Sequence, residues 1–144
     1  MWLWDAVTAD FFNITPEWEH DISEDNGTVG TTWQGRLYYA TAQQGFFSWA
    51  ASNNEITDLS RGLSAPRMSD IGGRVTALGS ASRELVIGLD RPVADATAGK
   101  TCRLVTLSNE GFLHTIAEPA MSTIDAISVH VGTRLWVFGR AYDA

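Results

Sequence analysis

The chain has 144 residues, of which 44% are hydrophobic and 19% are charged, a composition typical of one globular domain and too apolar for disorder. Its net charge of −7, with only ten Lys and Arg residues, argues against a nucleic-acid partner, because phosphate binding needs a basic stripe. A single cysteine, Cys102, excludes a disulfide within this sequence, and no run of 18 apolar residues suggests a membrane span.

In chain order, the sequence consists of short apolar runs rich in Val, Ile, Leu, Thr and aromatic residues, each bounded by Gly, Asn, Ser or Pro. This is the pattern of β-strands, and no stretch of ten or more residues has the apolar spacing of a helix. We therefore predict an all-β protein. The predicted strands are residues 1–6, 10–14, 28–33, 36–41, 45–50, 55–59, 74–79, 84–90, 102–107, 112–117, 125–131 and 134–140.

The strand pairs repeat along the chain. Leu37, Leu85 and Leu135 occupy the same place in three pairs, at spacings of 48 and 50 residues. Trp4 and Trp49 are 45 residues apart in a second kind of pair. A period near 48 with four short strands in each unit is typical of a β-propeller blade.

On this reading the chain is a single β-propeller segment of about three blades, each of four antiparallel strands. It divides into a half-blade at 1–16, blades at 27–60 and 73–118, and a half-blade at 124–142. The runs beginning at Leu37, Leu85 and Leu135 are apolar at consecutive positions, which predicts strands covered on both faces, as when blades stack.

The division of one blade between the two ends of the segment has consequences for assembly, because three blades cannot close a ring. The segment is then part of a longer propeller, or two copies complete each other's split blade to give six blades. A third arrangement, in which the terminal half-blades meet within one open arc, would expose two long sheet faces.

The layout resembles the β-propeller repeat families, with a period like that of kelch repeats. Residues 45–49 (GFFSW) are similar to the later aromatics of a kelch repeat, whereas the Gly-Gly pair at 72–73 precedes a first strand rather than following a second. The marks of WD repeats are missing, since Trp4-Asp5 occurs once and in the wrong strand. The order of the strand segments GRLYYAT, GFFSWA and ITDLS resembles that in the loosely repeating propellers of bacteriophage tail and virion proteins.

The longest loops should share one end of such a stack, because the connections after second and fourth strands leave on the same side. These are residues 16–27, 42–44, 60–71, 91–100 and 118–123. Binding residues concentrate on loops of this kind. We select Trp18, His20, Arg67 and Arg91 as candidates for the binding face; the competing interpretation is that they are ordinary rim residues.

No metal or other cofactor is predicted. The loop residues Glu17, Glu19, Asp21, Glu24 and Asp25 could offer oxygens to calcium, but the Asp-x-Asp-x-Asp-Gly spacing is missing, and a solvated acidic loop is the better interpretation. No histidine motif for a metal exists.

Among the remaining reactive residue types, His114 and His130 are interpreted as hydrogen-bonded structural residues of strands, and Cys102 as a small buried residue. The aspartates Asp58, Asp70, Asp90 and Asp125 flank strands and could supply a carboxylate pair for glycoside chemistry, but Asp is also a common turn residue. No nucleophile elbow, P-loop or dinucleotide fingerprint occurs, so we predict no catalytic residue.

The predicted function is non-enzymatic: a structural and binding module in a larger assembly such as a phage tail or virion. Its partners would be other protein chains or copies of itself that complete the propeller, with a surface glycan as a further candidate. We expect a soluble protein, with a virion or extracellular location favoured. The alternatives are a glycan-processing enzyme of the sialidase or lyase kind, which would aim Arg and Asp or Glu at one pocket, and an intracellular kelch-like adaptor.

Overall fold

The structure is a computed structural model that describes residues 2–13, 27–41, 46–53, 55–59, 74–90, 102–129 and 134–141. Every regular element in these ranges is a β-strand, so the predicted all-β class is confirmed. The strands are β1 (Trp2–Asp5), β2 (Asp10–Asn13), β3 (Gly27–Trp33), β4 (Arg36–Thr41), β5 (Phe46–Ala50), β6 (Glu55–Asp58), β7 (Arg74–Ser80), β8 (Glu84–Asp90), β9 (Cys102–Ser108), β10 (Leu113–Ala117), β11 (Met121–Val129) and β12 (Leu135–Ala141).

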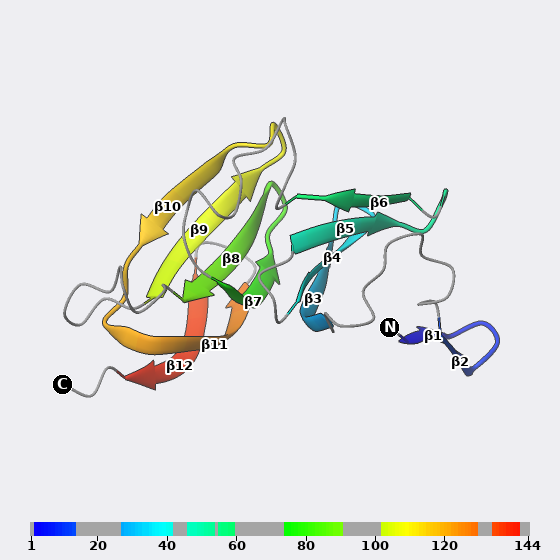
Figure 1. Cartoon of the computed structure of the whole chain (residues 1–144), viewed down its shortest axis with the longest axis horizontal. Coiled ribbons are helices and arrows are strands. Elements are labelled where there is room, and N and C mark those ends of the chain that lie inside the picture. The colour runs from blue at the N-terminus through cyan, green and yellow to red at the C-terminus, as the bar shows by residue number, and fades with distance from the viewer. Residues whose placement is uncertain are drawn as a thin grey trace.

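The strands form four antiparallel sheets (Figure 1). Strands β3, β4, β5 and β6 form sheet I in that order, and β7, β8, β9 and β10 form sheet II. Strands β11 and β12 form the two-stranded sheet III, and β1 and β2 form the N-terminal hairpin. The four-stranded antiparallel sheets predicted from the sequence are therefore present.

One β-bulge recurs at the same place in the first strand pair of each sheet. The register shifts lie between Gly27 and Val29 in sheet I, between Val75 and Ala77 in sheet II, and between Ile124 and Ala126 in sheet III. Beyond the bulge, each ladder runs without interruption to the repeated leucine at 37, 85 or 135. Bulges are structural features that set local twist and strand direction, so the sequence repeat is also a repeat of geometry.

The N-terminal hairpin repeats the last two strands of sheet I. Trp4 pairs with Phe11 in the hairpin, and Trp49 pairs with Ile56 in sheet I. The other three pairs of the hairpin correspond in the same way, each displaced by the 45 residues that separate the two tryptophans. Strands β1 and β2 thus have the register of the third and fourth strands of a sheet.

The first three strands of sheet II, β7, β8 and β9, are buried on both faces because their side chains alternate between two apolar neighbours, whereas β10 at the outer edge is largely exposed. Leu85 and Ile87 of β8 pack on one side against Trp33 and Phe46 of sheet I. Val86 packs on the other side, in a cluster with residues of sheet III. Successive side chains of a strand point to opposite faces, so the continuous apolar run of β8 serves two interfaces. The predicted double burial of this strand is confirmed.

Two glycines of sheet II let sheet III approach closely. A Cβ on Gly88 would lie 2.8 Å from Cγ2 of Ile124, and one on Gly79 would lie 2.7 Å from Cγ2 of Ile127. Real Cβ atoms essentially never come under 3.0 Å from another heavy atom. The side chains of β11 therefore rest directly on the backbone of sheet II.

The first strands of the three sheets lie side by side. Strand β3 contacts β7, and β7 contacts β11, whereas β6 and β10 form the opposite edges of sheets I and II. The sheets are thus stacked face to face with their first strands towards one side (Figure 1). The described strands form an open row rather than a closed ring.

One loop prediction is wrong. Residues 118–123 were expected to form a loop around Pro119, but β11 already begins at Met121 and extends to Val129. Met121 pairs with Ala141 and Thr123 pairs with Arg140 across β12. Proline lacks a donor for the ladder only at its own position, so a strand can start two residues later.

The turn between β3 and β4 was predicted at Gln34-Gly35 and is confirmed there. Both residues have positive φ, 50° and 73°, as a two-residue type I′ hairpin requires. We expect Gly35→Ala to lower the free energy of unfolding by about 1–2 kcal/mol, because a Cβ disfavours left-handed backbone. Nothing lies within 4 Å of the added Cβ, so the loss would come from the backbone alone. Urea denaturation would measure it.

Gly30→Ala is the matched control for that substitution. Gly30 lies in β3 of the same hairpin, and its added Cβ would be 3.4 Å from the nearest atom, the carbonyl oxygen of Tyr38. Alanine in a strand loses less backbone entropy than glycine, so stability should be unchanged or slightly higher. Equal losses in the two variants would contradict the turn assignment.

Tyr38, at the interface between sheets I and II, should make stability depend on alkaline pH. Burial raises the pKa of its hydroxyl above the ordinary 10.0, and the nearby Arg36 guanidinium partly offsets that rise. The unfolded chain then loses this proton at lower pH than the folded one. Tyr38 therefore contributes stability that is present below pH 10 and is lost as pH rises through the folded pKa.

Tyr38→Phe should remove this contribution. Urea midpoints measured between pH 8 and 11 should fall less steeply for the variant than for the native chain. Parallel curves for the two proteins would show that the hydroxyl is not protected from ionisation.

Candidate binding surface

Sheet III has one buried face and one exposed aromatic face. Ile124 is 0% exposed, and Leu135 and Val137 pack in its cluster against sheet II. On the other face, Trp136 is 52% exposed and Phe138 is 55% exposed. Their partners across the ladder, Ser128 and Ala126, are exposed as well. We call these four residues the open face of sheet III.

This exposure corrects the prediction that residues 134–140 form a strand covered on both faces. Leu135 and Val137 are partly buried as expected, but Trp136 and Phe138 have no covering sheet among the described residues. An apolar run shows that the side chains on both faces of a strand favour burial. It does not show that a neighbouring sheet covers each face. Large exposed apolar side chains that lie together on a folded domain indicate an interaction site.

The outer edge of β12 is a second feature of this surface. In sheet III, β12 pairs with β11 on one side and with no other described strand. In sheets I and II the corresponding strands, β4 and β8, each pair with a third strand, β5 or β9. An open strand edge presents N–H and C=O groups that can accept another strand.

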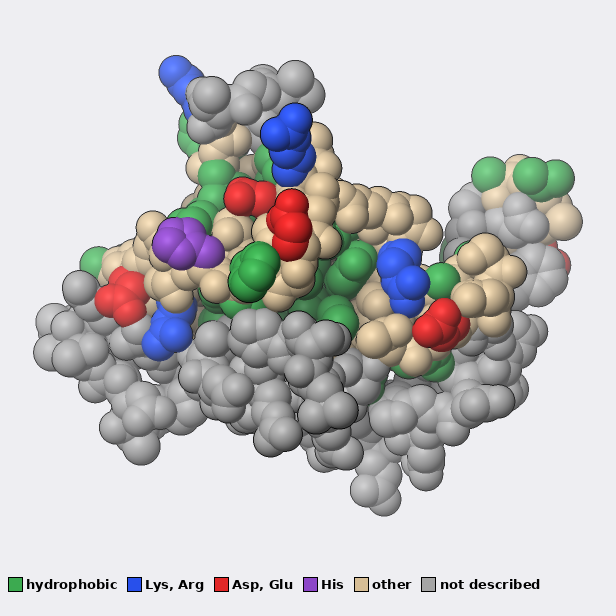
Figure 2. All heavy atoms as spheres, turned by 90° about the horizontal axis from the view of Figure 1, so that it is seen from above, with side chains coloured by type: hydrophobic (Ala, Val, Ile, Leu, Met, Phe, Trp, Pro, Cys, Tyr) green, Lys and Arg blue, Asp and Glu red, His purple; other side chains and the backbone are tan. Residues whose placement is uncertain are grey.

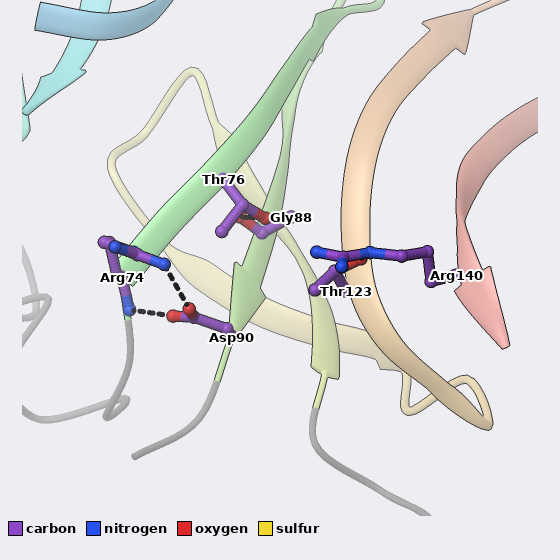
Figure 3. A network of polar contacts seen from close by, with 6 residues as sticks. All are labelled: Arg74, Thr76, Gly88, Asp90, Thr123 and Arg140. Carbon is purple, nitrogen blue, oxygen red and sulfur yellow. Dashed lines mark hydrogen bonds and ion pairs between the residues drawn. The ribbon is translucent and has the colours of Figure 1, made fainter. Parts of the chain in front are cut away.

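Polar contacts hold the ends of the strands where sheets II and III meet (Figure 3). Arg74 donates to Asp90 twice, from its backbone N to Oδ1 at 2.9 Å and from Nη2 to Oδ2 at 3.0 Å. Arg140 donates from Nε to Oγ1 of Thr123 at 3.1 Å. Each of these contacts joins two strands of one sheet. They fix strand ends, and the Arg74 and Asp90 charges satisfy each other.

Hydrogen bonds also join sheets I and II at their hairpin ends. Trp33 donates from Nε1 to the carbonyl oxygen of Ala81 at 2.9 Å, and Gln34 donates from Nε2 to Oδ1 of Asn109. These contacts come from the end of β3 and from the turns that precede β4, β8 and β10. Neighbouring sheets are therefore held in a fixed relation at this end.

The candidate residues for the binding face, Trp18, His20, Arg67 and Arg91, lie outside the described residues. So do the acidic residues of the loop at 16–27, together with His130 and Asp70, and the side chain of Asp58. The structure neither brings these groups together nor separates them. Asp90 is paired with Arg74, as described above, and Asp125 is exposed at the bulge of β11.

His114 lies within a strand, as predicted, and its side chain is exposed on β10. Cys102 is buried at the start of β9. Within the described ranges, no group of three or more His, Cys, Asp or Glu residues could hold a metal ion.

The charged side chains of the described residues are scattered. On the face seen in Figure 2, acidic and basic side chains are interspersed, and several of them lie next to each other. No basic stripe is visible among the coloured residues there. The open face and free edge of sheet III, which the sequence interpretation assigned to a covered strand, are thus the features that most clearly indicate a partner. The predicted half-blade at 124–142 carries the sequence signal for these features, because it contains only the first two strands of a unit.

Within the part of the chain that the structure describes, no helix is long and apolar enough to cross a membrane. Comparison with family models, with curated proteins and with solved structures found no match to this chain.

Proposed function

We propose that the chain is a segment of a β-propeller and acts as a non-enzymatic structural and binding module. One observation supports this above all: sheets I, II and III repeat one register and stack with β3, β7 and β11 side by side. In a propeller, blades related by a repeated rotation pack in this manner around a central axis. Strands β7, β8 and β9 of the middle sheet are covered on both faces, as expected for an internal blade.

The module would serve a larger assembly, such as a phage tail or virion, and present its long loops to a protein or a surface glycan. A rigid stack of sheets suits this role, because it fixes the positions of loops that carry recognition. Trp18, His20, Arg67 and Arg91 are the side chains that we propose for that contact. Trp and Arg are frequent among residues that dominate binding.

Direct imaging tests the architecture. Electron microscopy of the native assembly should show discs with radial blades around an axis. Two sheets packed as a closed sandwich, without radial order, would overturn the propeller.

Binding is tested on an immobilised glycan array, with the chain's products analysed in parallel. The expected result is retention of one class of glycan without release of sugar fragments. Alanine substitutions at Trp18, His20, Arg67 and Arg91 should weaken retention, whereas Ser82→Ala, in the turn between β7 and β8, should not. Release of fragments would overturn the non-enzymatic role in favour of a glycan-processing enzyme.

A further inference from the structure

Strand β12 divides its side chains between the covered and the open face of sheet III. Leu135 and Val137 pack in the cluster against sheet II. A Cβ on Gly139 would lie 2.6 Å from Cε of Met121, which packs against the same cluster. Because successive side chains of a strand point to opposite faces, the residues between them share the open face. In chain order these are Arg134, Trp136, Phe138 and Arg140.

An exposed arginine therefore flanks the two aromatic side chains at each end. Arg134 and Arg140 are six residues apart, which in a strand corresponds to about 20 Å. Arg140 donates from Nε to Oγ1 of Thr123 at 3.1 Å (Figure 3), a contact that orients its guanidinium and uses one of its five donors.

The charge of this face is positive, although the whole chain has a net charge of −7. Asp125, the exposed bulge residue of β11, is the one acidic residue among the described residues of sheet III. Neither Arg134 nor Arg140 forms an ion pair with it or with another described carboxylate. The two guanidinium groups thus lack an acidic partner within the described part of the chain.

The chemistry of a group that covers this face follows from its side chains. Ser128 lies opposite Trp136 and Ala126 opposite Phe138, so small neighbours leave both rings accessible. Burying the rings is favourable, but an uncharged cover would also take guanidinium groups out of water without a partner, which is costly. A matching occupant is therefore apolar at its centre and acidic at both ends.

The free edge of β12 gives that occupant a register. No described strand pairs with β12 on the side away from β11 (Figure 1). In a strand added there, every second side chain would lie beside one residue of the open face, with Cβ atoms about 4.5–5.5 Å apart. The matching order is acidic, apolar, apolar, acidic at alternate positions. Since this order reads the same in both directions, parallel and antiparallel addition both satisfy it.

We propose that sheet III binds an extended segment of a partner protein with the pattern acidic-x-apolar-x-apolar-x-acidic, added as a strand along β12. In strand addition, main-chain hydrogen bonds give affinity and alternate side chains give specificity. A single-stranded nucleic acid also matches aromatic and arginine side chains. It would leave the backbone groups of β12 unused, and as a continuous polyanion it would be repelled by the net charge of −7.

This partner class goes beyond the function proposed above. The site uses only the packing of sheet III on sheet II, so it does not depend on a closed ring of blades. The charge of the partner is set by Arg134 and Arg140, and its spacing is set by the strand period.

The outer strand of sheet II has different chemistry and provides an internal control. Strand β10 pairs only with β9, and Phe112 and Ile116 are exposed there. The charged residues just before and after β10 are Glu110 and Glu118. Glu118 lies 4.0 Å from Arg103, and Glu110 has no described ion-pair partner. An acidic segment would gain no partner at this edge, so it should select β12 over β10.

Nuclear magnetic resonance of the isotope-labelled chain, titrated with the synthetic peptide ETVTVTE, tests the site. The amides of β12 that point away from β11 should shift and become protected from hydrogen exchange, while the amides of β10 keep their positions. The peptide EVTTTVE has the same composition and end charges but places its valines on the opposite face of a strand. KTVTVTK reverses both charges. Each of these two peptides should bind roughly tenfold more weakly or less.

Charge reversal on the chain makes the test specific. The double variant Arg134→Glu with Arg140→Glu should bind KTVTVTK more tightly than ETVTVTE. Both side chains are exposed, so the variant should fold, with unchanged exchange protection in sheet II. The control Arg83→Glu, at the exposed turn between β7 and β8, should keep the native preference for ETVTVTE.

Several results would overturn the proposal. They are no amide shift in β12 at up to about 1 mM peptide, equal binding of the three peptides, and shifts without new protection of the outward amides of β12. Displacement of ETVTVTE by a thymidine oligonucleotide at lower concentration would assign the face to nucleic acid instead. Loss of exchange protection of sheet II in the native chain is a separate result, because it would also overturn the stack of sheets that supports the proposed function.

Discussion

Leu85→Asp is expected to unfold the chain. Leu85 is 0% exposed and lies in β8, where it packs into the interface between sheets I and II. An unpaired carboxylate at this position would lose its hydration without gaining a partner, and breaking a buried core in this way costs at least about 3–5 kcal/mol. The whole stability of a small domain is only about 5–15 kcal/mol.

Circular dichroism and urea denaturation measure this effect, with two controls. Leu85→Met keeps the volume of the side chain and should cost less than about 1.5 kcal/mol. Ser82→Asp adds the same charge at an exposed turn of the same hairpin and should change little. A cooperative transition of Leu85→Asp at the native urea midpoint would show that β8 is not covered by sheet I.

Gly88→Ala is expected to push sheet III away from sheet II. The added methyl group would lie 2.8 Å from Cγ2 of Ile124 and 3.3 Å from Cβ of Ala77. Ile124 is itself 0% exposed, so it has little room to move. Overpacking of this kind costs about 1–3 kcal/mol, and we expect amides of β11 and β12 to exchange faster while those of sheet I keep their protection.

A double-mutant cycle with Ile124→Ala makes the test specific. Ile124→Ala alone should cost about 2–5 kcal/mol through the cavity that it leaves. In the double variant the new methyl group occupies part of that cavity, so the combined loss should be smaller than the sum by more than about 0.5 kcal/mol, the usual limit of additivity. Additive losses would show that Gly88 and Ile124 are not in contact.

The four loop candidates are predicted from sequence composition alone, and all of them lie outside the described residues. Trp18, His20, Arg67 and Arg91 come from stretches rich in turn residues, where no strand period constrains the backbone. Sequence patterns predict that such segments are loops. They do not predict where a loop places its side chains, because that depends on contacts made across the fold.

Local patterns in the sequence determined the strands, their pairing and their repeat. Short apolar runs, turn residues such as Gln34-Gly35 and the recurring leucines act over a few positions, and the strands β4 and β8 begin and end where these patterns predict. Only the tertiary structure decided which apolar faces have a neighbour. Val86 and Trp136 share one place in the repeat, yet Val86 is covered by sheet III and Trp136 is exposed, because burial depends on a second surface that residues far along the chain, or in another chain, must bring.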